Sequence, residues 1–439
     1  MMLSIAFVLG TRPEIIKLAP VILEAERRKI KHSIIHTGQH YDENLSAQIF
    51  KSLGIRPPDY NLEVKRKEPY KLLSGMIEKL GELYLELNPS IVLSVGDTNS
   101  VLASSLACIQ NNIPYGHIEA GLRSFDFTMP EEINRRLVDH MSSILFAPSE
   151  RAVINLNNEG IDSGRIHHTG NTIIDSVRIF GSMINEKETK SADDILDKVK
   201  EPYILGTIHR ISNVENRANL EEIVKSFIEY KKHPSILLIH PRTKRKLEEF
   251  GLLQQLNQND KVHLYPPIEY LSLLKLLKHE KCLLILTDSG GLQEEASFLK
   301  KPCITIRPNT ERPETIEHEI NFLVETKSSR ILQKISLILS EDFEYRFATF
   351  KAPYGEGYAS QKIVDLIESN FKLLSFEPPI NYRSGSKSFN LLEMGVSMEK
   401  ELIEEEFQCQ IISVFDENGN PKMIEDKMKK GDRVRILKE

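Results

Sequence analysis

The chain has 439 residues, and at about 150 residues per domain this length allows two or three domains with cores of their own. Hydrophobic residues make up 40% and charged residues 27% of the chain, and the formal charge of -6 argues against a basic surface for nucleic acid. The four cysteines are far apart and lack histidines at metal-ligand spacing, so we expect no disulfide framework and no metal site. No stretch approaches the roughly 18 uninterrupted apolar residues of a membrane-spanning helix, so a cytoplasmic protein outside the membrane is expected.

Short apolar runs alternate with segments of helical periodicity from residue 3 to about residue 170. The predicted strands are 4–9, 33–37, 91–95, 114–119, 144–147 and 165–169. The predicted helices are 13–28, 69–87, 100–110 and 131–142. This alternation is typical of a parallel sheet with helices on both faces.

A polar, lysine-rich segment at 184–200 is the predicted link to a second series of the same kind. The strands predicted there are 203–207, 235–239, 262–265, 283–286 and 303–306. We therefore predict an α/β protein with two Rossmann-like, doubly wound domains at 1–180 and 181–376. Because open α/β sheets bind ligands at the carboxyl ends of their strands, a cleft between the domains is the expected site.

From Glu377 the sequence changes character. A linker-like stretch precedes a charged helical run at 398–408, and the Asn418-Gly419 step between two short β-like runs predicts a hairpin. Residues 377–439 are therefore predicted to form a linker and a small appended α+β module, whose role the sequence does not indicate.

Polar clusters follow several of the predicted strands in the first domain. In GTRPE at 10–14, a glycine turn leads into a helix start, which would aim Arg12 at a phosphate; an ordinary helix start with a surface arginine is the alternative. Asp97 and Glu119 would project from strand ends into the cleft, although Asp97 also suits a helix N-cap. Glu131 and its neighbour Glu132 would either lie with Asp97 and Glu119 in the cleft or stabilise the N-terminus of their helix through its dipole.

The second domain carries an arrangement suited to a nucleoside diphosphate. His209 and His240 each follow a strand with an arginine nearby, which indicates an anion pocket. In DSGGLQEE at 288–295, glycines allow a diphosphate to approach a helix N-terminus, and an acid in that helix can accept both ribose hydroxyls. With carboxylates across the cleft, this pattern points to chemistry on the sugar of a nucleotide-sugar.

The ordered motifs resemble those of the non-hydrolysing UDP-N-acetylglucosamine 2-epimerases. They are GTRPE (10–14), TGQHYD (37–42), GDTNS (96–100), HIEAGLRS (117–124), MPEEINRR (129–136), DSGGLQEEA (288–296) and TERPE (310–314). The resemblance spans about residues 3–375. It implies a glycosyltransferase-B-like fold and interconversion of UDP-N-acetylglucosamine and UDP-N-acetylmannosamine through a glycal intermediate, with neither metal nor nicotinamide cofactor.

The resemblance also implies roles for individual residues. The proton-transfer candidates are Asp97, Glu119 and Glu131, of which the first two are favoured as the main pair. The residues implied to bind or stabilise the UDP-sugar are Arg12, Lys17, Arg135, His209, Ser289, Gly290, Gly291, Glu295 and Arg312. Among these, Glu295 would hold the ribose, Arg312 the diphosphate and Arg135 the carboxylates. Related enzymes are dimers, so a homodimer is expected.

Two features depart from the bacterial pattern. Where many bacterial members have an aromatic-containing SPWPEE, this chain has TMPEE at 128–132, as in archaeal-type members and relatives that act on UDP-diacetamido-uronic acids. A second substrate molecule activates bacterial members at positions matching Gln39, Arg210 and His240, whereas Asp42 stands where others have different polar groups. The first departure leaves a uronic-acid epimerase open as an alternative. Because fold alone does not settle function, three further alternatives stay open: a hydrolysing epimerase, a glycosyltransferase and a nucleotide-sugar sensor.

Overall fold

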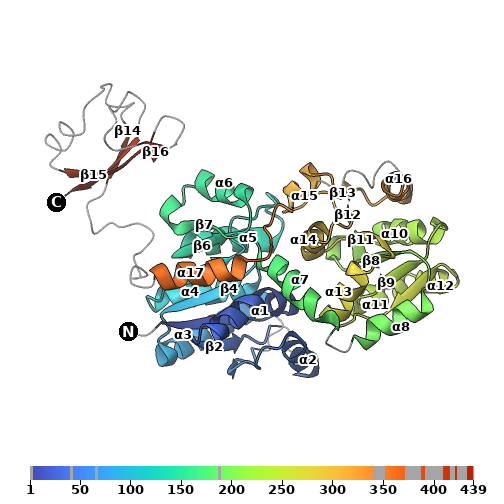
Figure 1. Cartoon of the computed structure of the whole chain (residues 1–439), viewed down its shortest axis with the longest axis horizontal. Helices are drawn as coiled ribbons and strands as arrows, with labels where there is room; N and C mark the ends of the chain where they lie inside the picture. Colours follow the sequence, from blue (N-terminus) through green and yellow to red (C-terminus); the bar gives the residue numbers. More distant parts are fainter. Residues whose placement is uncertain are drawn as a thin grey trace. The chain divides into compact units, whose positions relative to one another are not determined.

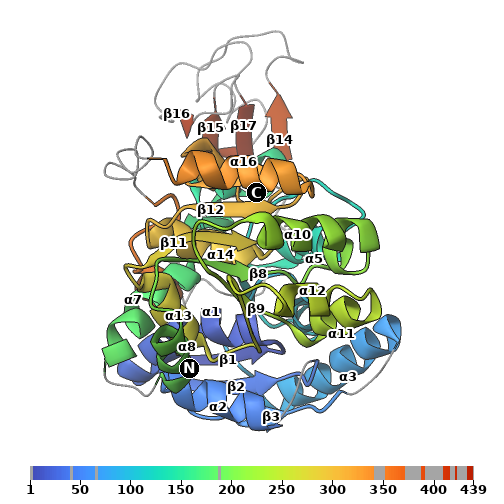
Figure 2. The same ribbon diagram turned by 90° about the vertical axis from the view of Figure 1, so that its right-hand side faces the viewer.

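The computed structural model describes residues 3–39, 43–64, 68–185, 189–340 and 352–370, together with four strands between residues 387 and 438. The chain divides into two compact units, Met1–Ser375 and Phe376–Glu439. The first unit contains two parallel sheets with helices between their strands, which confirms the predicted α/β class (Figures 1 and 2). In the part of the chain described, no helix is both long and apolar enough to cross a membrane.

The first sheet has seven parallel strands in the order β3-β2-β1-β4-β5-β6-β7. The strands are β1 (Ser4–Leu9), β2 (Lys31–His36), β3 (Tyr60–Asn61), β4 (Ile91–Val95), β5 (Tyr115–Ile118), β6 (Ile144–Ala147) and β7 (Ile166–His168). Alternate residues of β1 enter different cores, with Ile5, Phe7 and Leu9 in one and Ala6 and Val8 in the other. Both faces of the sheet are therefore buried, as a parallel sheet requires.

Helices cover both faces of this sheet. They are α1 (Arg12–Arg27), α2 (Glu43–Leu53), α3 (Pro69–Leu87), α4 (Asn99–Gln110), α5 (Pro130–Met141), α6 (Glu150–Asn158) and α7 (Thr172–Ser182), with a 3₁₀ turn at Ser163–Arg165. On one face α1 packs against α2 and α7, and on the other α4 packs against α3 and α5. Because helices cover both faces, the loops that connect strands and helices lie at the ends of the strands.

The second sheet has six parallel strands in the order β10-β9-β8-β11-β12-β13. The strands are β8 (Tyr203–Thr207), β9 (Ser235–Leu238), β10 (Val262–Tyr265), β11 (Cys282–Thr287), β12 (Cys303–Ile306) and β13 (Asn321–Val324). The helices are α8 (Lys190–Lys198), α9 (Ile211–Val214), α10 (Arg217–Glu229), α11 (Pro241–Glu249), α12 (Leu253–Asn257), α13 (Tyr270–Lys278), α14 (Gly290–Phe298), α15 (Pro313–Glu317) and α16 (Ser328–Ile338).

Two crossings of the chain join the halves that these sheets define. The first runs through α7, a 3₁₀ turn at Met183–Asn185 and α8, so the segment predicted as a polar link holds a helix whose Ala192 and Ile195 are buried. The second leads to α17 (Ala359–Asn370), which packs against α1 and α7 (Figure 1, orange beside blue). Asp175 of α7 accepts hydrogen bonds from the backbone nitrogens of Ala359 (3.0 Å) and Ser360 (2.7 Å). The last helix of the unit is thus fastened to the first half.

The second unit contains a four-stranded antiparallel sheet in the order β14-β17-β15-β16. Its strands are β14 (Lys387–Asn390), β15 (Cys409–Phe415), β16 (Pro421–Lys422) and β17 (Arg433–Lys438). The strands on either side of the Asn-Gly step pair antiparallel, as the sequence predicts, while the turn itself and the helical run at 398–408 lie outside the described residues.

Several predicted elements agree to the residue, including β1, β4, β6, β8, β10 and β12. In the first unit the predictions missed β3, which has only two residues, and β13, a four-residue strand at the sheet edge; in the second unit they missed β14 and β17. Periodicity carries little information over so few residues, and pairing with a neighbouring strand decides whether such a segment is extended.

Candidate active site

The predicted site residues lie where adjacent strands end. In the first sheet, Arg12, Asp97 and Glu119 follow the neighbouring strands β1, β4 and β5. In the second sheet, His209 and Ser289 follow the neighbouring strands β8 and β11. The carboxyl ends of parallel strands meet at one edge, so each half gathers its polar groups at a single edge.

Glu119 is buried and has a backbone φ of +73°, in the left-handed region that a non-glycine residue rarely adopts. Its carboxylate accepts hydrogen bonds from Lys17 of the same half and, at 3.0 Å, from Nη2 of Arg312 in the other half. Burial alone would lower the pKa of Lys17, but the nearby Glu119 and Glu294 carboxylates outweigh it and raise that pKa. Lys17 therefore stays charged beside Glu119.

A buried network behind Glu119 fixes the loop that carries it. Asp139 of α5 lies 2.6 Å from Nδ1 of His117 and 2.7 Å from Nη2 of Arg123, and it accepts a 3.1 Å hydrogen bond from the backbone nitrogen of Gly121. Burial would raise the pKa of Asp139, but His117 and Arg123 outweigh burial and hold it below the usual range. His117, Gly121 and Arg123 flank Glu119 in sequence, so these contacts hold the loop on both sides of its unusual backbone.

Arg312 carries one carboxylate on each of its three guanidinium nitrogens. Nη2 meets Glu119 at 3.0 Å, Nε meets Glu294 at 3.1 Å and Nη1 meets Glu311 at 3.1 Å. All four side chains are buried. We call these four residues the Arg312 cluster; it joins a carboxylate of the first half to two of the second. Sequence reasoning missed Glu294 and Glu311, although both lie inside the DSGGLQEEA and TERPE motifs.

Asp97 pairs with Arg135 of α5, which also lies 3.7 Å from Glu311. Burial alone would raise the pKa of Asp97, but Arg135 and then Lys17 outweigh burial and lower it. The residue next to it, Thr98, caps α4 by accepting a hydrogen bond from Ser100 N at 3.2 Å. The cap is therefore Thr98 rather than Asp97, which leaves the Asp97 carboxylate to Arg135.

The two adjacent acids at the start of α5 differ in environment. Glu131 is exposed, whereas Glu132 is fully buried. The Glu132 carboxylate accepts hydrogen bonds from Ser124 N at 2.8 Å and from Nε of Arg136 at 3.0 Å. Glu132 holds the preceding loop against the helix, and the structure does not bring Glu131 into the Arg312 cluster.

Glu14 joins the loops that follow β1 and β4. Its carboxylate accepts hydrogen bonds from the backbone nitrogens of Gly10 (2.6 Å) and Thr11 (2.8 Å), and from the Thr98 hydroxyl. Burial raises the pKa of Glu14 to about 7, although the hydrogen bond from Thr98 partly offsets this rise. These hydrogen bonds fix the two loops relative to each other, and with them the neighbouring residues Arg12 and Asp97.

The predicted nucleotide turn begins α14. A Cβ built on Gly291 would meet no atom within 4 Å, whereas one on Gly290 would lie 2.8 Å from Nη1 of Arg312. Glu295 is buried in the same helix, near Tyr270 and Arg12, and burial raises its pKa to about 7. Arg12 reaches the second half, where its Nη2 donates to the Ile268 carbonyl at 2.7 Å.

Asp288 organises the loop after β8. It accepts hydrogen bonds from the backbone nitrogens of His209 (3.0 Å) and Arg210 (2.9 Å), and from Nδ2 of Asn213 (3.1 Å). Burial would raise the pKa of Asp288, but hydrogen bonding and charge from His209 outweigh burial and lower it. The His209 ring, 43% exposed, lies with Nδ1 3.2 Å from the Asp288 carboxylate, so a buried acid orients an accessible imidazole.

The residues predicted to bind an activator are distributed over both halves. The rings of His209 and His240 lie 6.4 Å apart, and Arg210 contacts Glu311 at 3.5 Å. Gln39 lies in the first half and accepts a 2.8 Å hydrogen bond from the Ser100 hydroxyl. Asp42 lies outside the described residues. The activator site therefore stays a prediction.

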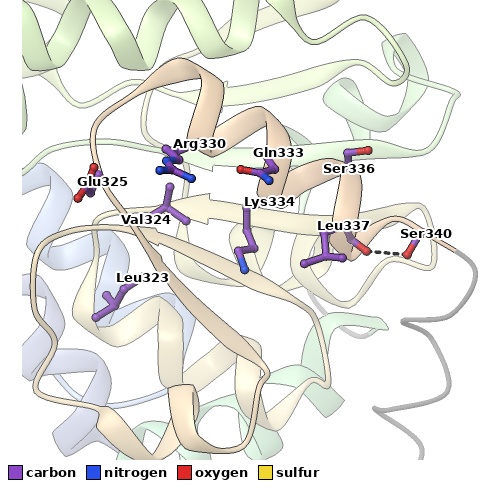
Figure 3. Close-up of a pocket in the computed structure, with 9 residues that line it drawn as sticks. All are labelled: Leu323, Val324, Glu325, Arg330, Gln333, Lys334, Ser336, Leu337 and Ser340. Carbon is purple, nitrogen blue, oxygen red and sulfur yellow. Dashed lines mark hydrogen bonds between the residues drawn. The ribbon is translucent and has the colours of Figure 1, made fainter.

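A separate hollow of about 760 Å³ lies beside β13 and α16 (Figure 3). It is lined by Leu323, Val324, Glu325, Arg330, Gln333, Lys334, Ser336, Leu337 and Ser340. None of these is a predicted site residue. The described residues contain no group of three or more His, Cys, Asp or Glu side chains that could hold a metal ion.

Comparison with known proteins identifies the family of this chain. Residues 23–368 match the family model described as UDP-N-acetylglucosamine 2-epimerase. The chain is 41% identical to the UDP-N-acetylglucosamine 2-epimerase of Methanocaldococcus jannaschii over 368 residues, which cover 83% of this chain and 99% of that protein. The chain belongs to the UDP-N-acetylglucosamine 2-epimerase family.

Solved structures of family members share its fold. The M. jannaschii UDP-GlcNAc 2-epimerase in complex with UDP-GlcNAc and UDP superposes with a TM-score of 0.77, covering 84% of this chain and all of that one. The Neisseria meningitidis UDP-GlcNAc 2-epimerase bound to UDP-GlcNAc is 33% identical, with the same TM-score and coverage. A Pseudomonas aeruginosa protein named UDP-2,3-diacetamido-2,3-dideoxy-D-glucuronate 2-epimerase is 36% identical over 371 residues, 83% of this chain and 99% of that protein. The family match ends at residue 368, before the appended sheet.

Proposed function

We propose that this protein inverts carbon 2 of the sugar in UDP-N-acetylglucosamine and gives UDP-N-acetylmannosamine without net hydrolysis. One observation carries the proposal: Glu119 from one half and Arg312 from the other are in direct contact, and Arg312 also adjoins the glycine turn suited to a diphosphate. Proton-transfer groups and anion-binding groups thus meet at one place between the halves. Membership of the 2-epimerase family gives the position of the inverted carbon.

The chemistry needs both sets of groups. When the bond between carbon 1 and the phosphate oxygen breaks, the electron pair leaves with UDP, and the cationic character of the sugar makes the hydrogen on carbon 2 removable. A carboxylate takes that proton and a glycal forms. UDP then adds again to carbon 1 while a proton returns to the opposite face of carbon 2, so at least two acid/base groups are required.

We assign the two faces of carbon 2 to Glu119 and Asp97, with Glu131 as the third acid. Lys17 pairs with Glu119, and Arg135 pairs with Asp97 and would keep the Asp97 carboxylate ionised. The residues proposed to stabilise the leaving diphosphate are Arg12, His209, Ser289, Gly290, Gly291 and Arg312, and Glu295 would hold the ribose. Preorganised donors aimed at developing negative charge contribute several kcal/mol in such sites.

A UDP-diacetamido-uronic acid is the second candidate substrate. The relative named for that substrate is 36% identical to this chain. Arg135, Arg210, Arg307 and Arg312 all lie within 3.7 Å of Glu311. Arginines are suited to bind an additional carboxylate on the sugar. Measuring kcat/KM for both UDP-sugars with the same enzyme decides between them.

Incubation with UDP-N-acetylglucosamine in deuterated water tests the reaction. We expect deuterium at carbon 2 of both epimers while the sugar stays joined to UDP, detected by NMR and mass spectrometry. Free N-acetylmannosamine with UDP as the dominant product would refute the non-hydrolysing reaction. Tight binding of UDP without any isotope exchange would indicate a sensor, and turnover only with an added acceptor would indicate a glycosyltransferase.

A further inference from the structure

Glu294 is a fully buried acid of α14 for which the proposed reaction has no role. Its Oε1 accepts a 2.8 Å hydrogen bond from Nδ2 of Asn171, the residue that caps α7 at the crossing between the halves. The same carboxylate lies 3.1 Å from Nε of Arg312. Its Oε2 has no hydrogen-bond partner among the described residues. Glu294 therefore contacts both Arg312 and the residue that caps α7.

The guanidinium of Arg312 is rigid and planar, so fixing two of its nitrogens determines where the third points. Glu311 accepts a hydrogen bond from Nη1, whereas Glu294 forms an ion pair with Nε without hydrogen-bond geometry; both acids belong to the same half as Arg312. The remaining nitrogen, Nη2, then meets Glu119 of the other half. The direction in which Arg312 points at Glu119 is therefore set by contacts within its own half.

We propose that Glu294 is a positioning residue that aims Arg312 at Glu119. The proposal rests on the proposed function, because it assigns Glu119 to proton transfer. Asn171 keeps Glu294 in place, which ties the aim of Arg312 to the crossing between the halves.

The pKa of Glu294 depends on the charged and titratable groups around it. The charged and titratable groups that interact with it are Arg312, Glu119, Lys17, Glu295 and Tyr354. Burial raises the pKa of Glu294 to about 7; Arg312 opposes this rise, and the Glu119 carboxylate adds to it.

Two substitutions separate geometry from charge. In Glu294→Gln the amide oxygen can take the place of Oε1 beside Asn171 and Arg312, while the charge is lost. In Glu294→Ala both the contact and the charge are lost. Glu317→Gln is the matched control, because it removes another acid that pairs across the halves, with Arg151, at an exposed position.

The experiment measures kcat and KM for the epimerisation between pH 5 and 9, together with crystal structures of both Glu294 variants. Glu294→Gln should retain kcat within about three-fold of the wild type at the plateau. Glu294→Ala should lower kcat at least ~30-fold with KM changed less than about three-fold. Arg312 should stay on Glu119 in the first variant and leave it in the second. Glu317→Gln should match the wild type.

A fall in kcat of Glu294→Gln as large as that of Glu294→Ala would overturn the proposal, because the amide keeps the contact with Arg312. Wild-type kcat in Glu294→Ala, or Arg312 unmoved in its structure, would overturn the positioning role. A wild-type protein without isotope exchange would defeat the proposed function instead; the position of Arg312 in the two crystal structures would still decide whether Glu294 aims it.

Discussion

Gly291→Ala should make the protein more stable and its nucleotide binding weaker. Gly291 is the second residue of α14, its φ lies outside the left-handed region, and an added Cβ would meet no protein atom within 4 Å. Alanine therefore fits without strain. Glycine costs up to about 1 kcal/mol relative to alanine inside a helix, and less in its first turn, so we expect a gain of about 0.5 kcal/mol in the free energy of unfolding.

The same open space is where a diphosphate would approach the N-terminus of α14 in the proposed complex. A methyl group there would hold the phosphate away from the backbone N–H groups. A hydrogen bond to a charged group contributes about 1.5–3 kcal/mol, so its loss should raise the Kd for UDP by roughly ten- to a hundred-fold. Calorimetric titration with UDP and unfolding in urea measure the two effects on one preparation.

Gly81→Ala is the control for this prediction. Gly81 lies in α3, where an added Cβ would be 3.5 Å from Nδ2 of Asn111, an ordinary contact. This variant should gain stability by the same helix effect and bind UDP as the wild type does. If Gly291→Ala also binds UDP with wild-type affinity, the diphosphate does not approach α14 there, and the assigned nucleotide turn is incorrect.

Three further predictions address the carboxylates. Glu119→Gln and Asp97→Asn should each lower kcat at least ~10²-fold with UDP affinity retained; near-normal turnover in both, measured by deuterium incorporation, would remove them from the mechanism. Glu14→Gln should flatten the pH dependence of stability: with a pKa of about 7, the folded state holds a proton that the unfolded state loses above about pH 4.5. Glu14 therefore lowers the free energy of unfolding as pH rises from about 4.5 to 7, by on the order of 3 kcal/mol. Urea unfolding at pH 5 and pH 8 should show a slope smaller by about this amount in Glu14→Gln, while Glu294 and Glu295, whose pKa values are also raised to about 7, keep their part of the slope. Asp139→Asn should destabilise the protein by about 3–5 kcal/mol, because it leaves the buried Arg123 without one of its carboxylates; an unchanged urea midpoint would contradict this.

The sheets could be predicted because their signal is local. Continuous apolar runs such as Ile91–Val95 are buried on both faces, and such a run indicates a strand of a parallel sheet whatever its neighbours are. The segment at 184–200 was harder, because its lysines suggest a solvent-exposed link. The periodicity of Ala192 and Ile195 becomes decisive only once α13 is present to cover them. Tertiary packing, rather than local preference, makes α8 a helix.

The site could be predicted as a set of loops but not as a set of contacts. Arg312 was assigned to a diphosphate from its motif, yet its three nitrogens meet Glu119, Glu294 and Glu311. Glu119 and Arg312 are separated by 193 residues, and nothing in either motif specifies this pairing. It depends on how the two halves are placed against each other, which the sequence pattern of each half does not contain.

The pair Glu131 and Glu132 makes the same point within one turn of helix. Side chains rotate by about 100° per residue along a helix, so adjacent acids must face different surroundings. The structure turns Glu132 inward to Ser124 and Arg136 and leaves Glu131 exposed. The buried Glu132 carboxylate already accepts hydrogen bonds from Ser124 and Arg136. Glu131 is therefore the acid of this pair whose carboxylate is accessible to a substrate. If Glu131 acts as the third acid, Glu131→Gln should lower kcat and leave the free energy of unfolding unchanged. Glu132→Gln should instead lower the free energy of unfolding.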